Sequence, residues 1–343
     1  MILDICVSSA CNLGCLYCSE GKATFDKSRV LNSKIKVSLQ EILNFTDEFD
    51  VEMIGFWGGE PFLNFELCKQ IMSERPHLKY MFYTNGMYID RYLNDLLYIK
   101  DKVKDLYVQV SYDGKAINDR LRLTKSMKSV SEQVRNAMLT LKKHGVHTNF
   151  KSTVTADTFK YMFESFKDII QCTDSYFPTP DCFSKYDDSK WNEYYSDLKS
   201  NLIQIAHYIY DNKLKLSSFK WFTDSRAICQ CGDGYISLDV DGYIFPCHSA
   251  MYSNLDHKIT HIRDINLKEK LEQSQKRYKD LNSKVNCVDC DVRYCMRCPI
   301  GSYQINKGTY EQRYTTKNID MCKVFKISDQ VYKALLSIKS KEG

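Results

Sequence analysis

The chain has 343 residues, of which 43% are hydrophobic and 27% charged, a composition typical of a globular protein with a sizeable core. Its 48 basic and 43 acidic residues are spread along the chain, so the net charge of +5 is too diffuse to indicate a nucleic-acid partner. No apolar run approaches the roughly 20 residues of a membrane span, and the chain enters a predicted strand without a secretory signal. We therefore expect a cytoplasmic protein that binds neither nucleic acid nor membrane.

The first half of the chain alternates short β-rich runs with amphipathic stretches, the pattern of a parallel sheet built from βα units. Strands are predicted over residues 3–7, 51–57, 79–83, 106–111 and 147–154, and helices over residues 38–49, 65–75, 89–99 and 130–144. Ser38 opens a capping box with Glu41, and Gly145 ends the fourth helix as a C-cap. A long helix is predicted over residues 190–212. Together these elements predict an α/β fold.

Fifteen cysteines are many for a chain without an export signal, and they indicate metal binding rather than disulfides. Cys6 and Cys68 fall in strand-like and helix-like apolar runs, and we predict that both are core thiols. Cys172 and Cys182 are scattered. The other eleven form three groups: Cys11, Cys15 and Cys18; Cys229, Cys231 and Cys247; and Cys287, Cys290, Cys295, Cys298 and Cys322.

The first group follows the first predicted strand in CNLGCLYC, with the spacing C-x₃-C-x₂-C. Iron–sulfur clusters are held by cysteine thiolates, and three thiolates leave one iron of a 4Fe-4S cube for a non-protein ligand. The stretch resembles the signature of the radical S-adenosylmethionine (SAM) superfamily. The resemblance implies that this iron binds SAM and that the reduced cluster cleaves SAM to a 5′-deoxyadenosyl radical, which abstracts a hydrogen atom from the substrate. Three zinc ligands are the alternative for these cysteines taken alone.

Further motifs follow the next predicted strands, at the carboxyl ends where ligand sites of parallel sheets form. Gly58-Gly59-Glu60-Pro61 resembles the GGEP motif of the superfamily, whose backbone and glutamate hold the SAM amino group. Arg122 matches an arginine that pairs with the SAM carboxylate, although Asn118 replaces the histidine usual in that motif. Each motif alone is also compatible with a polar loop. The resemblance implies SAM contacts at Tyr17, Gly58, Gly59, Glu60, Asn85, Ser111, Asp113 and Arg122.

The C-terminal third carries a second cysteine pattern. Cys231 and Cys247 fit C-x₉₋₁₅-G-x₄-C around a hairpin turn signal at Asp241-Gly242. With the later cysteines, this resembles the SPASM extension, an auxiliary-cluster domain of radical SAM enzymes that act on peptides and proteins, although two gaps are one residue shorter than usual. A zinc ribbon is the alternative for this part. The resemblance implies two auxiliary 4Fe-4S clusters, three clusters in all, with Cys229, Cys231, Cys247, Cys287, Cys290, Cys295, Cys298 and Cys322 as ligands.

Within this set, the interleaved pattern of the family implies that Cys298 returns to the first auxiliary site and that Cys322 completes the second. Cys229 is the least secure ligand, because Cys229-x-Cys231 is a cramped pair for one cube.

The resemblance covers nearly the whole chain. It implies a partial (β/α)6 TIM-like barrel over residues 1–220 and a SPASM domain over residues 221–343, without room for a separate leader-peptide recognition domain. In SPASM enzymes that form formylglycine in sulfatases, an aspartate follows the last cysteine of the G-x₄-C motif, whereas this chain has His248. We therefore expect a maturase of ribosomally made peptides that forms a cross-link, in particular a thioether to cysteine, with His248 as the candidate catalytic base.

Other functions stay open from the sequence alone. Formylglycine formation and peptide epimerisation are the alternatives within the same enzyme class, and a non-enzymatic zinc-ribbon binding protein is the alternative from another class. The expected cofactors are SAM and the three 4Fe-4S clusters. The expected partners are a small precursor peptide and an electron donor such as flavodoxin or ferredoxin.

Overall fold

The computed structural model describes residues 1–18, 34–183, 185–227, 229, 231–253, 257–284 and 290–342. The chain forms two compact units. The first consists of Met1–Tyr112, Leu121–Phe150 and Gln230–Asp280, and the second of Asp113–Arg120, Lys151–Cys229 and Leu281–Gly343. The boundary near residue 220 between a SAM-binding and an auxiliary-cluster domain stays a prediction.

Six strands, each followed in the chain by helical segments, confirm the predicted α/β fold. The strands are β1 (Ile2–Ser8), β2 (Met53–Gly58), β3 (Lys79–Thr84), β4 (Asp105–Ser111), β5 (His147–Val154) and β6 (Pro178–Pro180). The helices among and after them are α1 (Leu39–Glu48), α2 (Phe65–Glu74), α3 (Ile89–Lys100), α4 (Lys115–Leu121), α5 (Ser131–Lys143), α6 (Met162–Cys172) and α7 (Trp191–Asp211). Short 3₁₀ turns precede α2, α6 and α7, at Pro61–Asn64, Ala156–Tyr161 and Asp188–Lys190.

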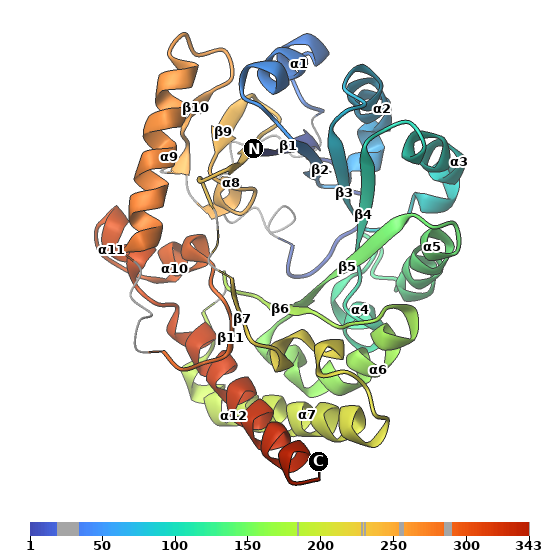
Figure 1. Cartoon of the computed structure of the whole chain (residues 1–343), viewed down its shortest axis with the longest axis vertical. Coiled ribbons are helices and arrows are strands. Elements are labelled where there is room, and N and C mark those ends of the chain that lie inside the picture. The colour runs from blue at the N-terminus through green and yellow to red at the C-terminus, as the bar shows by residue number, and fades with distance from the viewer. Residues whose placement is uncertain are drawn as a thin grey trace. The chain divides into compact units, whose positions relative to one another are not determined.

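In the first unit the strands pair in the order β10-β9-β8-β1-β2-β3-β4-β5, and β1 to β4 are parallel. Register aligns Ile5, Phe56, Phe82 and Val108 in one row across these four strands, and all four side chains are fully buried. Helices α1, α2, α3 and α5 cover the outer side of this sheet (Figure 1). The apolar residues of the strands therefore form a core between sheet and helices.

The predicted C-terminal hairpin forms β8 (Tyr235–Leu238) and β9 (Tyr243–Phe245), which pair antiparallel. Strand β8 also pairs in parallel with β1, with Ile2 opposite Tyr235 and Ile5 opposite Leu238. Strand β10 (Thr260–His261) adds to β9, and the helices α8 (Ala250–Ser253) and α9 (Leu267–Ser283) follow the strands β9 and β10. The hairpin therefore extends the sheet beyond the edge of β1.

The second unit has its own aromatic core. Trp221 is fully buried, and its ring lies 5.3 Å from that of Phe325. Strand β6 pairs in parallel with Ser152–Val154 of β5, and a second small sheet pairs β7 (Ser225–Ala227) with β11 (Tyr294–Met296). The 3₁₀ turns Leu216–Ser218 and Lys220–Phe222 precede β7, and α10 (Pro299–Ile305), α11 (Tyr310–Thr315) and α12 (Ile319–Glu342) complete the unit.

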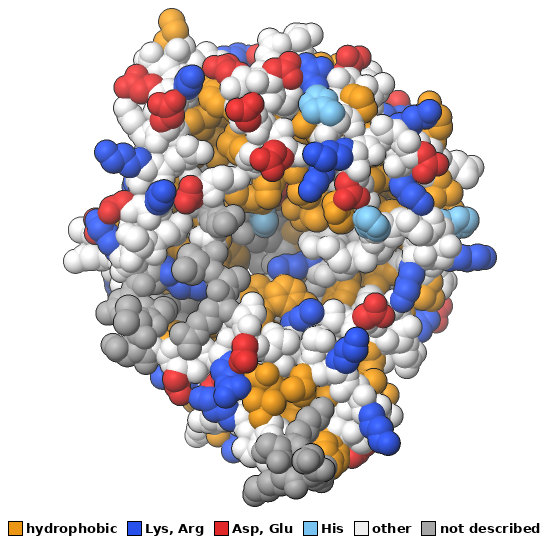
Figure 2. All heavy atoms as spheres, in the orientation of Figure 1, with side chains coloured by type: hydrophobic (Ala, Val, Ile, Leu, Met, Phe, Trp, Pro, Cys, Tyr) orange, Lys and Arg blue, Asp and Glu red, His pale blue; other side chains and the backbone are white. Residues whose placement is uncertain are grey.

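Charged side chains of both signs are interspersed on the surface. Figure 2 shows Lys and Arg among Asp and Glu over one face of the protein, as expected from a charge spread along the chain. None of the described helices combines the length and apolarity needed to cross a membrane.

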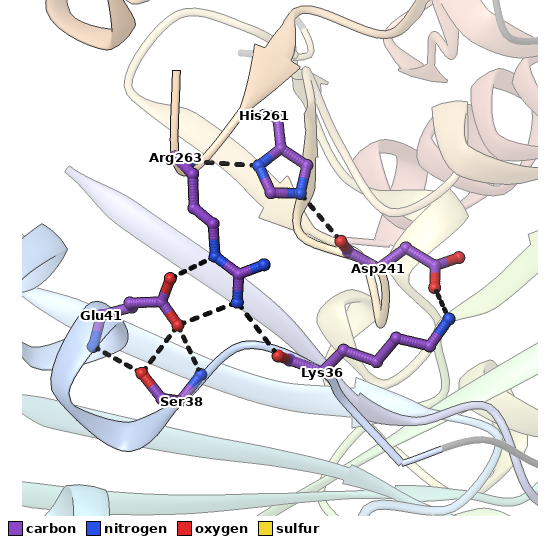
Figure 3. A network of polar contacts seen from close by, with 6 residues as sticks. All are labelled: Lys36, Ser38, Glu41, Asp241, His261 and Arg263. Carbon is purple, nitrogen blue, oxygen red and sulfur yellow. Dashed lines mark hydrogen bonds and ion pairs between the residues drawn. The ribbon is translucent and has the colours of Figure 1, made fainter. Parts of the chain in front are cut away.

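A network of polar contacts in the first unit joins the start of α1 to the C-terminal hairpin (Figure 3). The Arg263 guanidinium donates to both carboxylate oxygens of Glu41, and its Nη2 lies 3.1 Å from Glu41 Oε2. The Lys36 ammonium lies 2.6 Å from Asp241 Oδ1, and His261 Nε2 donates to the Asp241 carbonyl at 3.0 Å. Residues more than 200 positions apart in the chain are thereby connected.

The same glutamate completes the predicted capping box. Ser38 Oγ accepts from the Glu41 N–H at 3.3 Å, and the Ser38 N–H donates to Glu41 Oε2 at 2.8 Å. Hydrogen bonds from Arg263 and then from Ser38 lower the pKa of Glu41 to about 2. Since the folded-state pKa lies below the ordinary value of 4.5, the charge of Glu41 contributes stability at neutral pH, and this contribution is lost as the pH falls from 4.5 toward about 2.

We predict that Glu41→Ala lowers the free energy of unfolding by about 1 kcal/mol, because both a cap and a partly exposed ion pair are lost. Glu41→Gln keeps the capping hydrogen bonds and loses the charge, so it should cost less. Thermal unfolding at pH 7 measures both effects, with Glu48→Gln at the exposed end of the same helix as control. Equal stability of Glu41→Ala and wild type would contradict this role.

Candidate active site

The three cysteines of the first group occupy the loop that follows β1 in the first unit. The Leu13 N–H donates to Cys11 Sγ at 3.4 Å, and the Cys18 N–H donates to the Cys15 carbonyl at 3.1 Å. Burial is the main cause that raises the pKa of the Cys11 thiol to about 12, and the neighbouring thiols of Cys15 and Cys18 add to it. A coordinating metal deprotonates such thiols. Three thiols in one loop, of which Cys11 Sγ accepts from a backbone N–H, fit an iron–sulfur cluster.

The segment that carries Arg122 pairs with this cysteine loop. The Gly14 N–H donates to the Leu123 carbonyl, and the Leu16 N–H donates to the Leu121 carbonyl, both at 2.8 Å. The Arg122 side chain is 7% exposed, and its guanidinium lies over the Tyr17 ring, 5.2 Å from the ring centroid. Tyr17 and Arg122, both predicted SAM contacts, are therefore brought together beside the cysteines.

The Gly58-Gly59-Glu60 turn at the end of β2 packs against the backbone that leads into the cysteine loop. The Gly59 N–H donates to the Ser8 carbonyl at 2.9 Å, and the Glu60 N–H donates to the Ala10 carbonyl at 2.8 Å. Gly58 has a φ of +132°, and a Cβ there would lie 2.1 Å from the Ser8 carbonyl oxygen. Glycine is thus required at this position by the approach of the chain to itself.

The Glu60 carboxylate is fully buried and accepts three hydrogen bonds. They come from the Thr84 hydroxyl at 2.8 Å and from the N–H groups of Asn85 at 2.9 Å and Phe62 at 3.2 Å. Burial raises the pKa of Glu60 to about 7. The Asn85 side-chain amide donates to Asn12 Oδ1 at 2.8 Å and lies 3.8 Å from Cys11 Sγ. The ends of β1, β2 and β3 therefore converge at the cysteine loop.

The two predicted contacts after β4 belong to different units. Ser111 ends β4 in the first unit, and Asp113 lies in the second. The Asp113 carboxylate is fully buried and accepts from the Thr153 N–H at 2.6 Å, while the Asp113 N–H donates to Asn118 Oδ1 at 3.0 Å. SAM contacts from Ser111 and Asp113 stay predictions.

His248 lies beside a buried carboxylate of β1. Its Nδ1 is 2.7 Å from the Tyr235 hydroxyl and 3.3 Å from Asp4 Oδ2, and its side chain is 46% exposed whereas Asp4 is fully buried. The Tyr235 hydroxyl also donates to Asp4 Oδ2, and the charge of Asp4 acts on Tyr83 as well. Burial first, and then the charge of Asp4, raise the pKa of both tyrosines, so each hydroxyl keeps its proton. The Trp57 ring lies 5.3 Å from the imidazole. A polar cluster lined by aromatic rings therefore surrounds His248.

Two of the C-terminal cysteines come together in the first unit. The Gly232 N–H, next to Cys231, donates at 2.8 Å to the Pro246 carbonyl, next to Cys247. Both cysteines are buried, at 1% and 7% exposure.

The other described C-terminal cysteines belong to the second unit. Cys298 caps α10, where its Sγ accepts from the Gly301 N–H at 3.3 Å, and it interacts electrostatically with Cys229. Cys290 and Cys295 lie before and within β11, Cys322 lies in the first turn of α12, and Cys287 lies outside the described residues. No described cysteine forms a disulfide. In the described part of the chain, no three His, Cys, Asp or Glu side chains converge on one ion position.

Three residues of these clusters were not predicted as site residues. Asp4 and Tyr235 lie beside His248, and the thiol of Cys182 interacts electrostatically with that of Cys298. A carboxylate inside the apolar strand ILDICVS was the available signal for Asp4. Cys182 follows Pro178 and Pro180 at the end of the sixth strand, the same kind of position as the first cysteine group.

The chain is similar to two curated proteins. It is 29% identical over 171 residues to the uncharacterized protein MJ0907 of Methanocaldococcus jannaschii, an alignment that covers 48% of this chain and only 56% of that protein. It is 20% identical over 340 residues to the radical SAM cyclopropyl synthase TigE of Paramaledivibacter caminithermalis, covering 89% of this chain and 69% of that protein.

Solved structures of anSMEcpe share the fold. The structure with bound AdoMet and the Cp18Cys peptide has a TM-score of 0.72 at 20% identity, covering 100% of this chain and 99% of that chain. The structure with AdoMet and the Kp18Cys peptide has a TM-score of 0.71 at 20% identity, covering 99% and 100% of the two chains.

We predict that Glu60→Gln weakens SAM binding about tenfold, because an amide cannot accept every hydrogen bond of the buried carboxylate and bonds to a charged group stabilise by roughly 1.5–3 kcal/mol. Calorimetric titration of the cluster-loaded protein with SAM measures this affinity. Glu66→Gln, on the exposed start of α2, is the matched control. Unchanged SAM affinity in Glu60→Gln would show that the carboxylate does not support the SAM site.

The family model of the Radical SAM superfamily matches residues 5–171. This range contains the cysteine loop, the turn at Glu60, Asn85 and the Arg122 segment, which the structure brings together in the first unit. Its fold agrees with that of anSMEcpe. Residues 5–171 of the chain therefore form a domain of the radical SAM superfamily.

Proposed function

We propose that this radical SAM enzyme modifies a small peptide by forming a cross-link, in the first place a thioether between a cysteine sulfur and a substrate carbon. The observation that carries the proposal is the cluster around His248, where an imidazole lies 3.3 Å from a buried carboxylate and 5.3 Å from an indole ring. Such a cluster offers a peptide side chain both apolar contact and a proton acceptor. The anSMEcpe structures with bound peptides support a peptide substrate for this fold.

SAM is proposed to bind at the cysteine loop. Cys11, Cys15 and Cys18 would hold the cluster, the Glu60 turn and Asn85 would receive the amino end of SAM, and Arg122 would pair with its carboxylate. Tyr17, Gly58, Gly59, Ser111 and Asp113 complete the proposed set of contacts. When bound, SAM and the clusters supply a 5′-deoxyadenosyl radical that takes a hydrogen atom from carbon and an acceptor for the electron left over. Flavodoxin or ferredoxin is the proposed source of the reducing electron.

The auxiliary clusters are part of the same proposal. Cys229, Cys231, Cys247, Cys287, Cys290, Cys295, Cys298 and Cys322 supply eight thiolates, enough for two fully ligated 4Fe-4S centres. The positions of the described cysteines support these two clusters. Backbone contacts bring Cys231 and Cys247 together in the first unit, and Cys298 interacts electrostatically with Cys229 in the second.

His248 is proposed to accept the proton that a substrate thiol loses when its sulfur bonds to carbon. Asp4 and Tyr235 support this role, because they fix the ring from the Nδ1 side. A hydrogen-bonded carboxylate both orients an imidazole and stabilises its charged form. Asp4 is therefore a positioning residue that acts through His248.

A second candidate is ring closure between two carbons. The likeness to TigE, a cyclopropyl synthase, favours this reaction over formylglycine formation and over epimerisation. Thioether formation and carbon–carbon bond formation both remove two hydrogens, so the mass of the product does not separate them. The number of free thiols does, because only the thioether consumes one.

We predict that the enzyme, loaded with iron and sulfide and supplied with SAM and a reductant, converts a small cysteine-containing peptide encoded beside it to a product lighter by two hydrogens. Alkylation of the product with iodoacetamide should then label one thiol fewer than in the substrate. Mass spectrometry reads both quantities from one sample, and omission of SAM is the control.

Other masses would contradict the cross-link. Loss of sulfur with gain of oxygen would indicate formylglycine formation, and an unchanged mass with altered chirality would indicate epimerisation. A product lighter by two hydrogens with all its thiols intact would favour ring closure between carbons. Stoichiometric zinc without iron would instead favour a zinc-ribbon protein.

We predict that His248→Ala lowers product formation about a hundredfold or more, the usual contribution of a positioned general base, while 5′-deoxyadenosine is still formed. The measured quantity is the ratio of product to 5′-deoxyadenosine, which a purely structural defect would leave unchanged. Asp4→Asn should lower the ratio less, since the imidazole remains. His144→Ala, at an exposed position after α5, is the control. A ratio equal to that of wild type in His248→Ala would exclude the base role.

A further inference from the structure

Cys182, which lies outside the predicted ligand set, contacts a predicted cluster ligand in the second unit. The thiols of Cys182 and Cys298 interact electrostatically. Both sulfurs lie against Gly301: the N–H of this glycine donates to Cys298 Sγ at 3.3 Å, and a Cβ built on it would lie 3.0 Å from Cys182 Sγ. Cys298 also interacts electrostatically with Cys229. Two thiols that lie against the same glycine are donors of the type that binds iron.

The surroundings of these thiols favour negative charge. Lys151, on β5 in the same unit, interacts electrostatically with both Cys182 and Cys298. Its ammonium also lies over the Phe177 ring, 5.9 Å from the ring centroid. A cation held near thiolates offsets the net negative charge of a cluster with thiolate ligands, and N–H groups directed at sulfur stabilise it further.

The backbone around Cys182 is held in place. The Asn318 side-chain amide donates to the Cys182 carbonyl at 3.2 Å, and the Asp181 N–H donates to the Val154 carbonyl at 2.8 Å. A Cβ at position 301 would lie 2.7 Å from that same Cys182 carbonyl, so glycine allows α10 to approach the residue closely. The position of the Cys182 thiol is therefore set by β5, α10 and the start of α12.

We propose that Cys182 is a thiolate ligand of the auxiliary iron–sulfur cluster to which Cys298 contributes. This inference rests on the proposed function, in which the chain carries auxiliary clusters. Two cubes have eight ligand positions, and Cys182 is a ninth thiol. Cys182 therefore takes the position of Cys229, which is one residue from Cys231 and forms with it a cramped pair for two corners of one cube. A cube binds each thiolate at a different iron, and its ligands therefore need not converge on one ion position.

The test compares iron retention in Cys182→Ala with that in wild type and two reference variants. Each protein is loaded anaerobically with iron and sulfide, challenged with a chelator, and analysed for iron and acid-labile sulfide. Wild type should retain roughly twelve irons per chain and Cys182→Ala roughly eight, the loss of one cube. Cys298→Ala should lose the same amount. Cys172→Ala, which removes a buried thiol of α6 in the same unit, should match wild type.

Retention by Cys182→Ala at the wild-type value, with loss in Cys298→Ala, would overturn the role of Cys182 and leave the auxiliary clusters standing. Retention of roughly four irons by wild type itself would overturn both, because only one cube would then be bound. The two failures are therefore distinguishable.

A second measurement uses the unmutated chain and does not depend on the folding of a variant. Native protein is alkylated with and without loaded clusters, and the modified cysteines are mapped by mass spectrometry. Cluster loading should protect Cys182 and Cys298 in parallel. Protection of Cys298 with no change at Cys182 would contradict the inference.

Discussion

The candidate site depends on the contact between the Gly58-Gly59-Glu60 turn and the backbone of residues 8–10. Two N–H groups of this turn donate to the carbonyls of Ser8 and Ala10, directly before Cys11. The contact fixes the start of the cysteine loop, and the buried carboxylate of Glu60 then extends the support to Thr84 and Asn85 at the end of β3. Two backbone hydrogen bonds thus join the ends of β1 and β2, and the Glu60 carboxylate adds the end of β3.

The pairing of β8 with β1 brings together residues of the candidate site that are far apart in the sequence. It places Tyr235 opposite Ile2 and brings the segment that follows β9, with His248, to the carboxylate of Asp4. A cysteine-rich hairpin from the last third of the chain therefore shares one sheet with the strand that leads into the proposed SAM-binding loop. The ion pair of Arg263 with Glu41 also connects the N-terminal and C-terminal parts of the chain, because it joins the residues after β10 to α1.

Local signals predicted much of this arrangement. The capping box at Ser38, the hairpin at Asp241-Gly242 and strand β5 are encoded within a few residues, and all three lie where the sequence indicates. The convergence of Glu60 and Arg122 on the cysteine loop followed from their positions after β2 and β4, two strands of one parallel sheet. The pairing of Ile2 with Tyr235 has no local signal, because it joins residues more than 200 positions apart whose strands are compatible with other partners. Cys182 was missed for the same reason: its neighbour Cys298 is set by the packing of α10, not by spacing along the chain.

The central claim is that Cys11, Cys15 and Cys18 hold an iron–sulfur cluster to which SAM binds directly. Electron paramagnetic resonance of the reduced protein, recorded before and after SAM is added, tests this most directly, because a ligand on the open iron changes the spectrum of that cluster. A variant with alanine at all three positions is the control. We expect SAM to change the spectrum of the wild-type protein and to leave that of the variant unchanged. A wild-type spectrum that does not respond to SAM, or an equal response in the variant, would contradict the assignment.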